Sequence, residues 1–291
     1  NQIATLSQQF MSAKMKPVKM KLDNDPKKPP FLNISREGQG EAISLLHGWG
    51  MNSAVFKPLS AALSHEYAVS RVDLPGYGMS DWFHSGEVYE DLWARQLDLM
   101  SEQIPDSSLM AWSMGGLYAM KLVNRYPDRY KRLILVASNP CFVQRDDWSS
   151  AVESWVFTGF ADDFIDNWPA TIRRFLGLQM HGVDDVRNRI RMIAKLLVDG
   201  GAPNPDALRF GLELLLNEDA REELRQLKVP VMVILGNRDK LVPISLATEL
   251  SQINPRIRVE CLAHSAHAPF LSHLEDFAGL IREFVKPSPP R

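Results

Sequence analysis

From residue 42 onward, short apolar runs alternate with longer amphipathic segments, and this alternation restricts the fold more than any other feature. Apolar runs bounded by turn residues are typical of strands in a buried parallel sheet, and the intervening segments suit crossover helices. The sequence therefore predicts an α/β protein with a mostly parallel central sheet flanked by helices. The expected strands are 42–46, 67–73, 107–112, 131–137, 229–235 and 256–262, and the expected helices are 54–64, 88–104, 114–126, 244–253 and 272–285.

The alternation stops between residues 138 and 229. This interval has helix-like segments at 168–178, 183–198 and 205–216 but no strand-like run, so we expect a helical lid inserted between two core strands. The expected division is a flexible N-terminal extension at 1–40, a core at 41–138 and 221–287, a lid at 139–220 and a frayed tail at 288–291.

Composition narrows the possible partners. The formal net charge of −2 argues against a nucleic-acid-binding protein, which normally carries a basic excess. No apolar run approaches the roughly 20 residues that span a bilayer, so no membrane partner is expected. The two cysteines, Cys141 and Cys261, are too few for a disulfide framework and lack the spacing of metal ligands. These features favour a cytoplasmic protein without a metal.

A serine stands at the junction between an expected strand and an expected helix. The segment 109–116 reads L-M-A-W-S-M-G-G, with Ser113 followed by small residues. This pattern is typical of a nucleophile elbow, a sharp strand-to-helix turn that exposes a serine hydroxyl and leaves room only for small neighbours. Ala111 replaces the first glycine of the usual G-x-S-x-G pattern, a change of one small residue for another.

An elbow serine needs a base and an acid that orients it, in the chain order Ser, Asp or Glu, His. Asp239 follows the expected strand 229–235, and His267 follows the strand 256–262. Because the carboxyl ends of parallel strands meet at one edge of a sheet, we expect both side chains beside Ser113. His264 is the alternative base, but it lies closer to the strand and is predicted to be a structural loop residue.

Attack on an ester creates an oxyanion that backbone donors must stabilise. The turn H-G-W-G at 47–50 follows the first core strand, so we expect the amides of Trp49 and Met114 to form the oxyanion hole. The segment D-L-P-G-Y-G-M-S at 73–80 lacks a nucleotide-binding pattern and is interpreted as a structural turn. Cys141 has no elbow around it and is expected in a pocket wall.

Together the motifs H-G-W-G, D-L-P-G-x-G-x-S, W-S-M-G-G, N-R-D-x-L-V-P and H-A-P-F resemble those of the α/β-hydrolase superfamily over residues 42–285. The segments 45–50, 137–148, 174–179 and 266–273 resemble, more narrowly, the pimeloyl-ACP methyl ester carboxylesterases of biotin synthesis (the BioH family). This resemblance implies a serine esterase that needs no cofactor and releases methanol from the methyl ester of pimeloyl-acyl carrier protein. We expect the protein to be a monomer.

The resemblance also implies that lid arginines recognise an acidic acyl carrier protein. Residues 170–195 hold six basic against two acidic side chains, and Arg187 and Arg191 share a helical face at i, i+4 spacing. The positions that correspond to substrate or carrier contacts in that family are Phe142, Arg174, Arg187 and Arg191. Ala170 stands where the family pattern has a further arginine, and a solvated helix face remains the alternative for these charges.

Two other classes of function stay open at this level. A general short-chain carboxylesterase, a thioesterase or a C–C bond hydrolase uses the same three residues, and small esters are then the substrates. A hydrolase-fold receptor or binding protein retains the site but acts through a partner, because fold alone does not determine function. Epoxide hydrolases and haloalkane dehalogenases are disfavoured because their elbow nucleophile is Asp, whereas this chain has Ser113.

Overall fold

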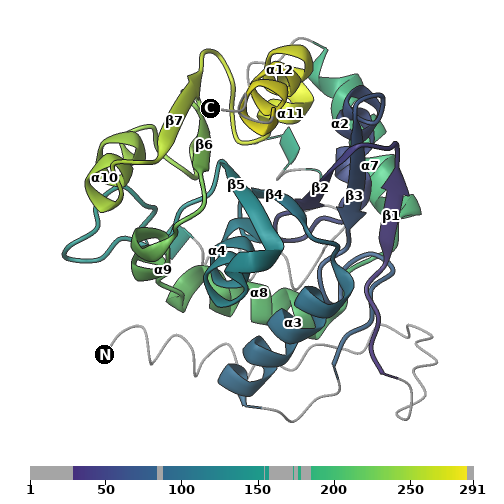
Figure 1. Ribbon diagram of the computed structural model, residues 1–291, viewed down its shortest axis with the longest axis horizontal. Coiled ribbons are helices and arrows are strands. Elements are labelled where there is room, and N and C mark those ends of the chain that lie inside the picture. The colour runs from purple at the N-terminus through teal and green to yellow at the C-terminus, as the bar shows by residue number, and fades with distance from the viewer. Residues whose placement is uncertain are drawn as a thin grey trace.

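The computed structural model describes residues 29–83, 88–153, 155–156, 173, 176–177 and 185–286. Its centre is a seven-stranded sheet in the order β1-β3-β2-β4-β5-β6-β7 (Figure 1). Only β1 is antiparallel to its neighbour; the other strands are parallel. The strands are β1 Ile34–Glu37, β2 Glu41–Leu46, β3 Tyr67–Val72, β4 Ser107–Trp112, β5 Tyr130–Val136, β6 Val231–Gly236 and β7 Arg258–Leu262.

Helices cover both faces of this sheet. In Figure 1, α2, α11 and α12 lie on one side of it, and α3, α4 and α9 lie on the other. The predicted α/β class with a mostly parallel sheet is confirmed. The helices are α2 Lys57–Leu63, α3 Tyr89–Gln103, α4 Gly115–Arg125, α7 Val186–Asp199, α8 Pro205–Asn217, α9 Arg221–Gln226, α10 Leu246–Ile253, α11 Pro269–Ser272 and α12 Leu274–Val285, with 3-10 turns at Ser53–Phe56 and Pro127–Arg129.

The sheet begins earlier than the sequence predicts. Strand β1 lies inside the segment 1–40 that we expected to be an extension outside the core, so that boundary is wrong. Its sequence I-S-R-E lacks an apolar run because an edge strand keeps polar side chains near water. Glu37 ties β1 to the core, since its carboxylate accepts hydrogen bonds from Ser60 Oγ at 2.9 Å and Arg71 Nη2 at 2.5 Å. Residues 1–28, and with them the expected flexibility, lie outside the described residues.

The parallel register brings the carboxyl ends of β4, β6 and β7 to one edge of the sheet. All six residues of β4 and of β6 are buried, which fits their apolar sequences and their central positions. Two expected helices differ from the structure in their bounds. The segment 54–64 is divided into a 3-10 turn and α2, which has Pro58 in its first turn. The segment 272–285 corresponds to α12, and only Ser272 belongs to the short helix α11 before it.

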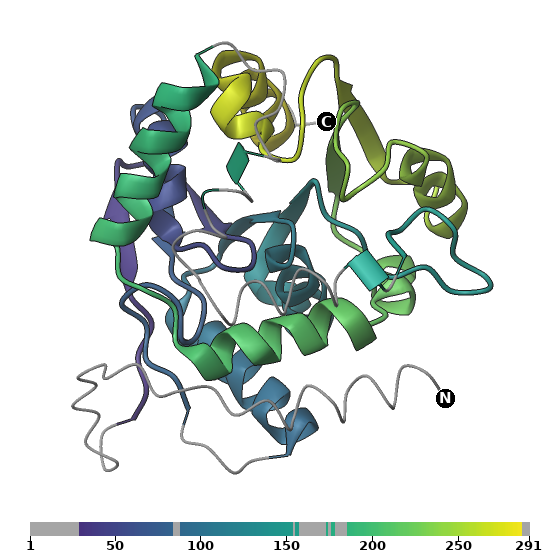
Figure 2. The same ribbon diagram turned by 180° about the vertical axis from the view of Figure 1, so that it is seen from behind.

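The segment between β5 and β6 interrupts the alternation, as the sequence predicts. Within its described residues there are helices α7, α8 and α9 and two isolated bridges, Val143 with Val152 and Arg145 with Trp148, but no strand. Figure 2 shows α7 upright along one side of the molecule and α8 across its lower half. The helix expected at 168–178 falls mostly outside the described residues. No helix in the described part of the chain is both long and apolar enough to cross a membrane.

Candidate active site

Ser113 occupies a strained turn between β4 and α4. Its φ of 54° lies in the left-handed region, which non-glycine residues seldom adopt. The turn is held on both sides: the Ser113 amide donates to Val136 O at 2.9 Å, and Ser138 Oγ donates to Ser113 O at 2.8 Å. Ser113 therefore stands at a fixed position on the carboxyl edge of the sheet, as in a nucleophile elbow.

The small residues after Ser113 are required by crowding. A Cβ atom on Gly115 would lie 2.6 Å from His47 O, and one on Gly116 would lie 2.7 Å from the Ser138 Cβ and closer still to its Oγ. Real Cβ atoms do not approach so closely. Thus α4 starts against the ends of β2 and β5, and only glycine allows this approach.

A chain of hydrogen bonds joins the three residues that the sequence singled out. His267 Nε2 lies 2.9 Å from Ser113 Oγ, and His267 Nδ1 lies 2.7 Å from Asp239 Oδ2. The side chains of His267 and Asp239 are only 2% and 1% exposed. Because Nδ1–H donates a hydrogen bond to the carboxylate, Nε2 carries no proton and is left to accept the hydrogen bond of the serine hydroxyl.

Backbone contacts set Asp239 and His267 in place. Asp239 Oδ1 accepts hydrogen bonds from the amides of Leu241 at 2.8 Å and Val242 at 3.1 Å, which leaves Oδ2 for the imidazole. Trp112 Nε1 donates to His267 O at 2.8 Å, so the last residue of β4 fixes the loop that carries the histidine. Sequence reasoning missed this role of Trp112, because nothing in the sequence pairs an indole with a loop 155 residues away.

His264 does not reach the serine. It is exposed, has a φ of 61°, and its Nδ1 lies 2.9 Å from Arg238 Nη2. Its amide donates to Asn237 Oδ1 at 2.8 Å, which joins the two loops that follow β6 and β7. The geometry thus gives His264 the place of a loop residue and brings His267 to Ser113.

The amides of Trp49 and Met114 belong to the two turns that border Ser113. A Cβ on Gly48 would lie 3.1 Å from Ser113 Cβ, so the turn after β2 passes directly over the serine. Met114 precedes the first residue of α4, where backbone N–H groups have no partner within the helix. Both amides therefore belong to turns that lie beside the serine.

Helix α8 closes over this corner. Trp49 Nε1 donates to Leu208 O at 2.9 Å. A Cβ on Gly211 would lie 2.6 Å from Trp49 Cδ1 and 2.9 Å from Met114 Sδ, so the helix packs directly on both residues. Gly211 is a second position that sequence reasoning missed, because a lone glycine in a helix carries no local signal for this contact.

The glycine turn at 73–80 has the structural role that the sequence indicated. Asp73 Oδ1 accepts from the Ser53 amide at 2.7 Å, and Oδ2 accepts from the Met79 amide at 3.0 Å. Gly76 and Gly78 have φ values of 76° and 57°, which favour glycine. Asn33 Nδ2 also donates to Asp73 Oδ2 at 2.8 Å, so three groups of the chain hold this carboxylate.

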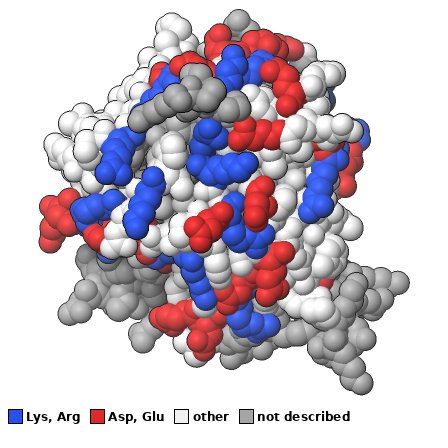
Figure 3. Space-filling model, viewed as in Figure 1, with Lys and Arg blue, Asp and Glu red and all other residues white. Residues whose placement is uncertain are grey.

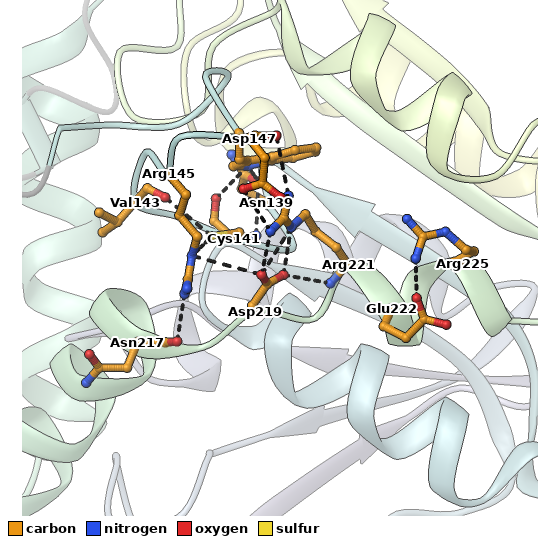
Figure 4. Close-up of polar contacts among 11 residues, drawn as sticks. Asn139, Cys141, Val143, Arg145, Asp147, Asn217, Asp219, Arg221, Glu222 and Arg225 are labelled. Atoms are coloured by element: carbon orange, nitrogen blue, oxygen red, sulfur yellow. Dashed lines mark hydrogen bonds and ion pairs between the residues drawn. The ribbon is translucent and has the colours of Figure 1, made fainter.

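A polar cluster joins the start of the inserted segment to its end. Figure 4 shows Arg221 between the carboxylates of Asp219 and Asp147, with Oδ atoms at 2.8 and 3.0 Å, and Arg145 beside them. Arg145 Nε lies 3.0 Å from Cys141 Sγ. Burial raises the pKa of the Cys141 thiol, so the thiol stays protonated. We call these five residues the insertion-base cluster; Cys141 belongs to it.

The side chains expected to contact substrate or carrier differ in position. Arg187 and Arg191 are exposed on the same face of α7, whereas Phe142 is 2% exposed in the bend after β5. Arg174 lies outside the described residues. On the face seen in Figure 3, positive and negative side chains are interspersed, so that face shows no large patch of one sign.

A groove of about 480 Å³ runs between α7 and α11, with Pro58 of α2 at its edge. Phe270 lines it and also stacks edge-on against Trp112 at 5.1 Å, so the groove borders the wall of the site without reaching Ser113. Among the described residues, no three His, Cys, Asp or Glu side chains are grouped to hold a metal ion.

Comparison with known proteins gives a consistent result. Residues 45–280 match the model of the "Alpha/beta hydrolase family". The chain is 38% identical over 255 residues to the pimeloyl-[acyl-carrier protein] methyl ester esterase of Aeromonas salmonicida, which covers 87% of this chain and 99% of the relative. It is 36% identical to the esterase of the same name from Nitrosomonas europaea, over 84% of this chain and 96% of that one.

Solved structures show the same fold at lower identity. A bromoperoxidase from Bacillus anthracis superposes with a TM-score of 0.79 at 20% identity, over 90% of this chain and 97% of that chain. An esterase from Exiguobacterium antarcticum superposes with a TM-score of 0.76 at 22% identity, over 89% and 96%. At these identities the likeness concerns the fold alone.

Proposed function

Because the chain belongs to the α/β hydrolase family, we propose that it is a serine carboxylesterase that hydrolyses the methyl ester of pimeloyl-acyl carrier protein. The observation that carries this function is the hydrogen-bonded chain from Ser113 through His267 to Asp239, on a chain 38% identical to an esterase of that name. The products are pimeloyl-acyl carrier protein and methanol.

The reaction proceeds by acyl transfer in two halves. His267 Nε2 takes the proton of Ser113 Oγ as this oxygen attacks the ester carbonyl, and Asp239 stabilises the imidazolium that forms. His267 then gives the proton to the departing methoxide, and methanol leaves. In the second half His267 takes a proton from water as the water oxygen attacks the acyl carbon on Ser113. The bond from this carbon to Ser113 Oγ then breaks, His267 returns the proton to Ser113 Oγ, and the pimeloyl group leaves as a free carboxylic acid that ionises in water.

The oxyanion of each tetrahedral intermediate needs donors that are already in position. We assign this role to the amides of Trp49 and Met114. Such donors act in a buried site without the reorganisation that water requires, and losing one typically costs about 10² to 10³ in rate.

We further propose that residues 139–220 form a lid that receives the carrier. Arg187 and Arg191 are exposed on one face of α7, and an acidic carrier with its phosphate-bearing arm is the complementary partner. Arg174 and Phe142 are assigned to the same recognition by the family resemblance. The core is then 41–138 and 221–287, with β1 added at its edge.

The proposed place of this enzyme is biotin synthesis in the cytoplasm, where it acts as a monomer. The free thiols of Cys141 and Cys261 suit a reducing compartment. The hydrolysis requires neither a metal nor an organic cofactor, because the nucleophile, base and oxyanion donors all come from the chain.

The test compares pimeloyl-acyl carrier protein methyl ester with p-nitrophenyl butyrate as substrates of the full chain. The key variant is Arg187→Glu with Arg191→Glu, and the matched control is Arg36→Glu with Arg256→Glu, two exposed arginines on other elements with the same change in charge. We expect the lid variant to lose more than about tenfold in kcat/KM for the carrier substrate at low salt and to keep its activity on the small ester.

Each outcome has one meaning. Loss of carrier activity in the lid variant alone supports docking on α7. If both variants lose the same factor in kcat/KM for the carrier substrate, the effect comes from net charge alone and the docking proposal is wrong. If the wild type hydrolyses the small ester but not the carrier substrate, it is a general short-chain esterase.

A further inference from the structure

His47 is a fully buried side chain that the proposed mechanism leaves without a role. We propose that His47 is a positioning residue, whose imidazole orients the peptide group between Gly48 and Trp49 and so aims the Trp49 amide at the developing oxyanion. This inference rests on the proposed function, because it assumes that the Trp49 amide serves as an oxyanion donor. It adds a residue whose side chain need not touch the substrate.

The hydrogen bonds around His47 settle which ring nitrogen carries the proton. Nε2 lies 3.0 Å from the amide nitrogen of Leu74, and an amide N–H can only donate. Nε2 is therefore the acceptor and has no proton. A neutral imidazole then carries its proton on Nδ1, which lies 2.8 Å from Gly48 O and donates to it.

The Gly48 carbonyl belongs to the same peptide unit as the Trp49 amide. In a trans peptide the C=O and N–H bonds point in opposite directions, and the chain has no cis peptide in its described residues. Once Gly48 O is held by His47 Nδ1, the Trp49 N–H must point away from the imidazole. Gly48 O also accepts from the Met51 amide at 3.3 Å, so the plane of this peptide is fixed by two donors.

The same peptide stands beside the nucleophile. A Cβ on Gly48 would lie 3.1 Å from Ser113 Cβ, so a rotation of this peptide changes the direction of an N–H group on a turn that lies against the nucleophilic serine. A hydrogen bond to the carbonyl also polarises the amide and strengthens its N–H as a donor. His47 therefore acts on the direction and on the strength of the Trp49 donor.

The environment of His47 keeps the ring neutral and in place. Burial lowers the pKa of His47, although the nearby Asp73 carboxylate acts in the opposite direction. The ring of Tyr77 meets the imidazole edge-on at 5.3 Å between centroids. Tyr77 OH in turn donates to Ala207 O of α8, so the ring that packs on His47 is itself anchored.

Two matched substitutions separate the two hydrogen bonds. His47→Asn places an amide nitrogen where Nδ1 lies and can keep the bond to Gly48 O, but it cannot reach Leu74. His47→Gln places an amide oxygen where Nε2 lies and can keep the bond from the Leu74 amide, but it loses the donor to Gly48 O. Both replace the ring by a neutral amide, so each serves as the control for the other.

The measurements are kcat and KM for p-nitrophenyl butyrate and the inhibition constant of 1,1,1-trifluorooctan-2-one. Ser113 Oγ adds to the ketone carbon of this inhibitor, the proton passes to His267, and the ketone oxygen becomes an oxyanion. In His47→Gln we expect kcat to fall at least about tenfold and the inhibition constant to rise by a similar factor, with KM within about threefold. In His47→Asn we expect both values to stay within about threefold of the wild type.

A merely structural role predicts a different pattern. If both variants lose activity in proportion to their thermal stability, or if His47→Gln keeps its affinity for the trifluoromethyl ketone, the inference is wrong. ¹⁵N NMR of the histidine rings in the wild type gives a test that requires no variant: His47 must show a protonated Nδ1 and a bare Nε2. The opposite tautomer would overturn the inference.

These tests separate the inference from the proposed function. A wild type that is active on the small ester and inactive on the carrier substrate leaves the His47 inference intact and removes only the proposed substrate. A wild type that hydrolyses no ester removes the proposed function, and the inference about an oxyanion donor falls with it.

Discussion

The two helices α4 and α7 are of similar length, but they are attached to the molecule in different ways. Eight of the 11 residues of α4 are buried, and its first turn is wedged between strand ends. Only two of the 14 residues of α7, Ile193 and Leu197, are buried. A mostly buried helix that begins two residues after Ser113 holds this residue in place, whereas a helix with few buried residues is expected to open locally at lower cost.

Few polar contacts attach the described residues of α7 to the core. Asn52 Nδ2 donates to Leu197 O at 3.0 Å, and Arg189 Nη1 donates to Leu271 O at 2.8 Å. Both are side-chain contacts to single carbonyls, unlike the backbone ladders that fix the strand ends. Among the described residues, α4 is therefore held by far more buried residues than α7, and we expect α7 to open more readily than α4.

The largest expected effect comes from Asp239→Asn in the core. The amide oxygen would keep the bonds from Leu241 and Val242, which leaves the NH₂ group facing His267 Nδ1. The histidine must then carry its proton on Nε2, where it can no longer accept from Ser113. We expect kcat for p-nitrophenyl butyrate to fall by about 10⁴ with little change in melting temperature.

A large fall in stability together with activity would contradict this prediction, because it would mean that Asp239 chiefly holds the fold. Asp239→Ala serves as the comparison variant, since it also leaves the two amides without their acceptor. It should therefore lose more stability than Asp239→Asn.

The next effect concerns the packing of α4 against the core, measured as a change in the free energy of unfolding. Gly116→Ala forces a Cβ against Ser138 and is expected to destabilise the protein by about 2 kcal/mol. Gly279→Ala on α12 is the matched control, because nothing lies within 4 Å of its new Cβ and alanine favours a helix, so it should stabilise by up to about 1 kcal/mol. Urea unfolding measures both values, and opposite signs are required.

A smaller effect is expected where α7 meets α11. Arg189→Met removes the donor to Leu271 O and should lower local stability by about 1 kcal/mol. Hydrogen exchange of the α7 amides should accelerate about fivefold, while α4 stays unchanged. Arg187→Met, on the exposed face of α7, is the control and should leave exchange unaltered; equal acceleration in both variants would mean that Arg189 anchors nothing.

The smallest effect is the loss of stability at low pH that Asp219 of the insertion-base cluster contributes. Burial alone would raise the pKa of Asp219, but hydrogen bonds from Arg221 outweigh it and hold the pKa below the ordinary 3.8. A lowered carboxyl pKa contributes stability that is present above the unfolded pKa and is lost as pH falls through the folded value. Acidification below about pH 4 should therefore cost wild type up to about 1 kcal/mol more than Asp219→Asn, measured by melting temperature across pH. Parallel curves would contradict this.

The sequence was most informative where structure is local or periodic. Strand β4 runs over the residues that were predicted, and Ser113, Asp239 and His267 were named in advance because each follows a predicted strand of the sheet. The short strand β1 was missed, because its polar edge sequence has no apolar run to reveal it.

Contacts between segments distant along the chain were also missed. Trp112 donates to the His267 carbonyl, and Gly211 leaves room for Trp49. Both contacts depend on how distant segments meet in three dimensions. His47 was interpreted only as part of a tight turn, since its bond to Leu74 joins loops after two different strands. Tertiary proximity decides these roles, and local sequence does not carry it.

The most direct test of the account is the site of covalent modification by a fluorophosphonate probe, located by peptide mass spectrometry on the full chain. The account predicts one adduct, on the peptide that contains Ser113, at a rate that falls strongly in His267→Ala. An active esterase that is labelled on another residue, or that keeps its activity after Ser113→Ala, would contradict it.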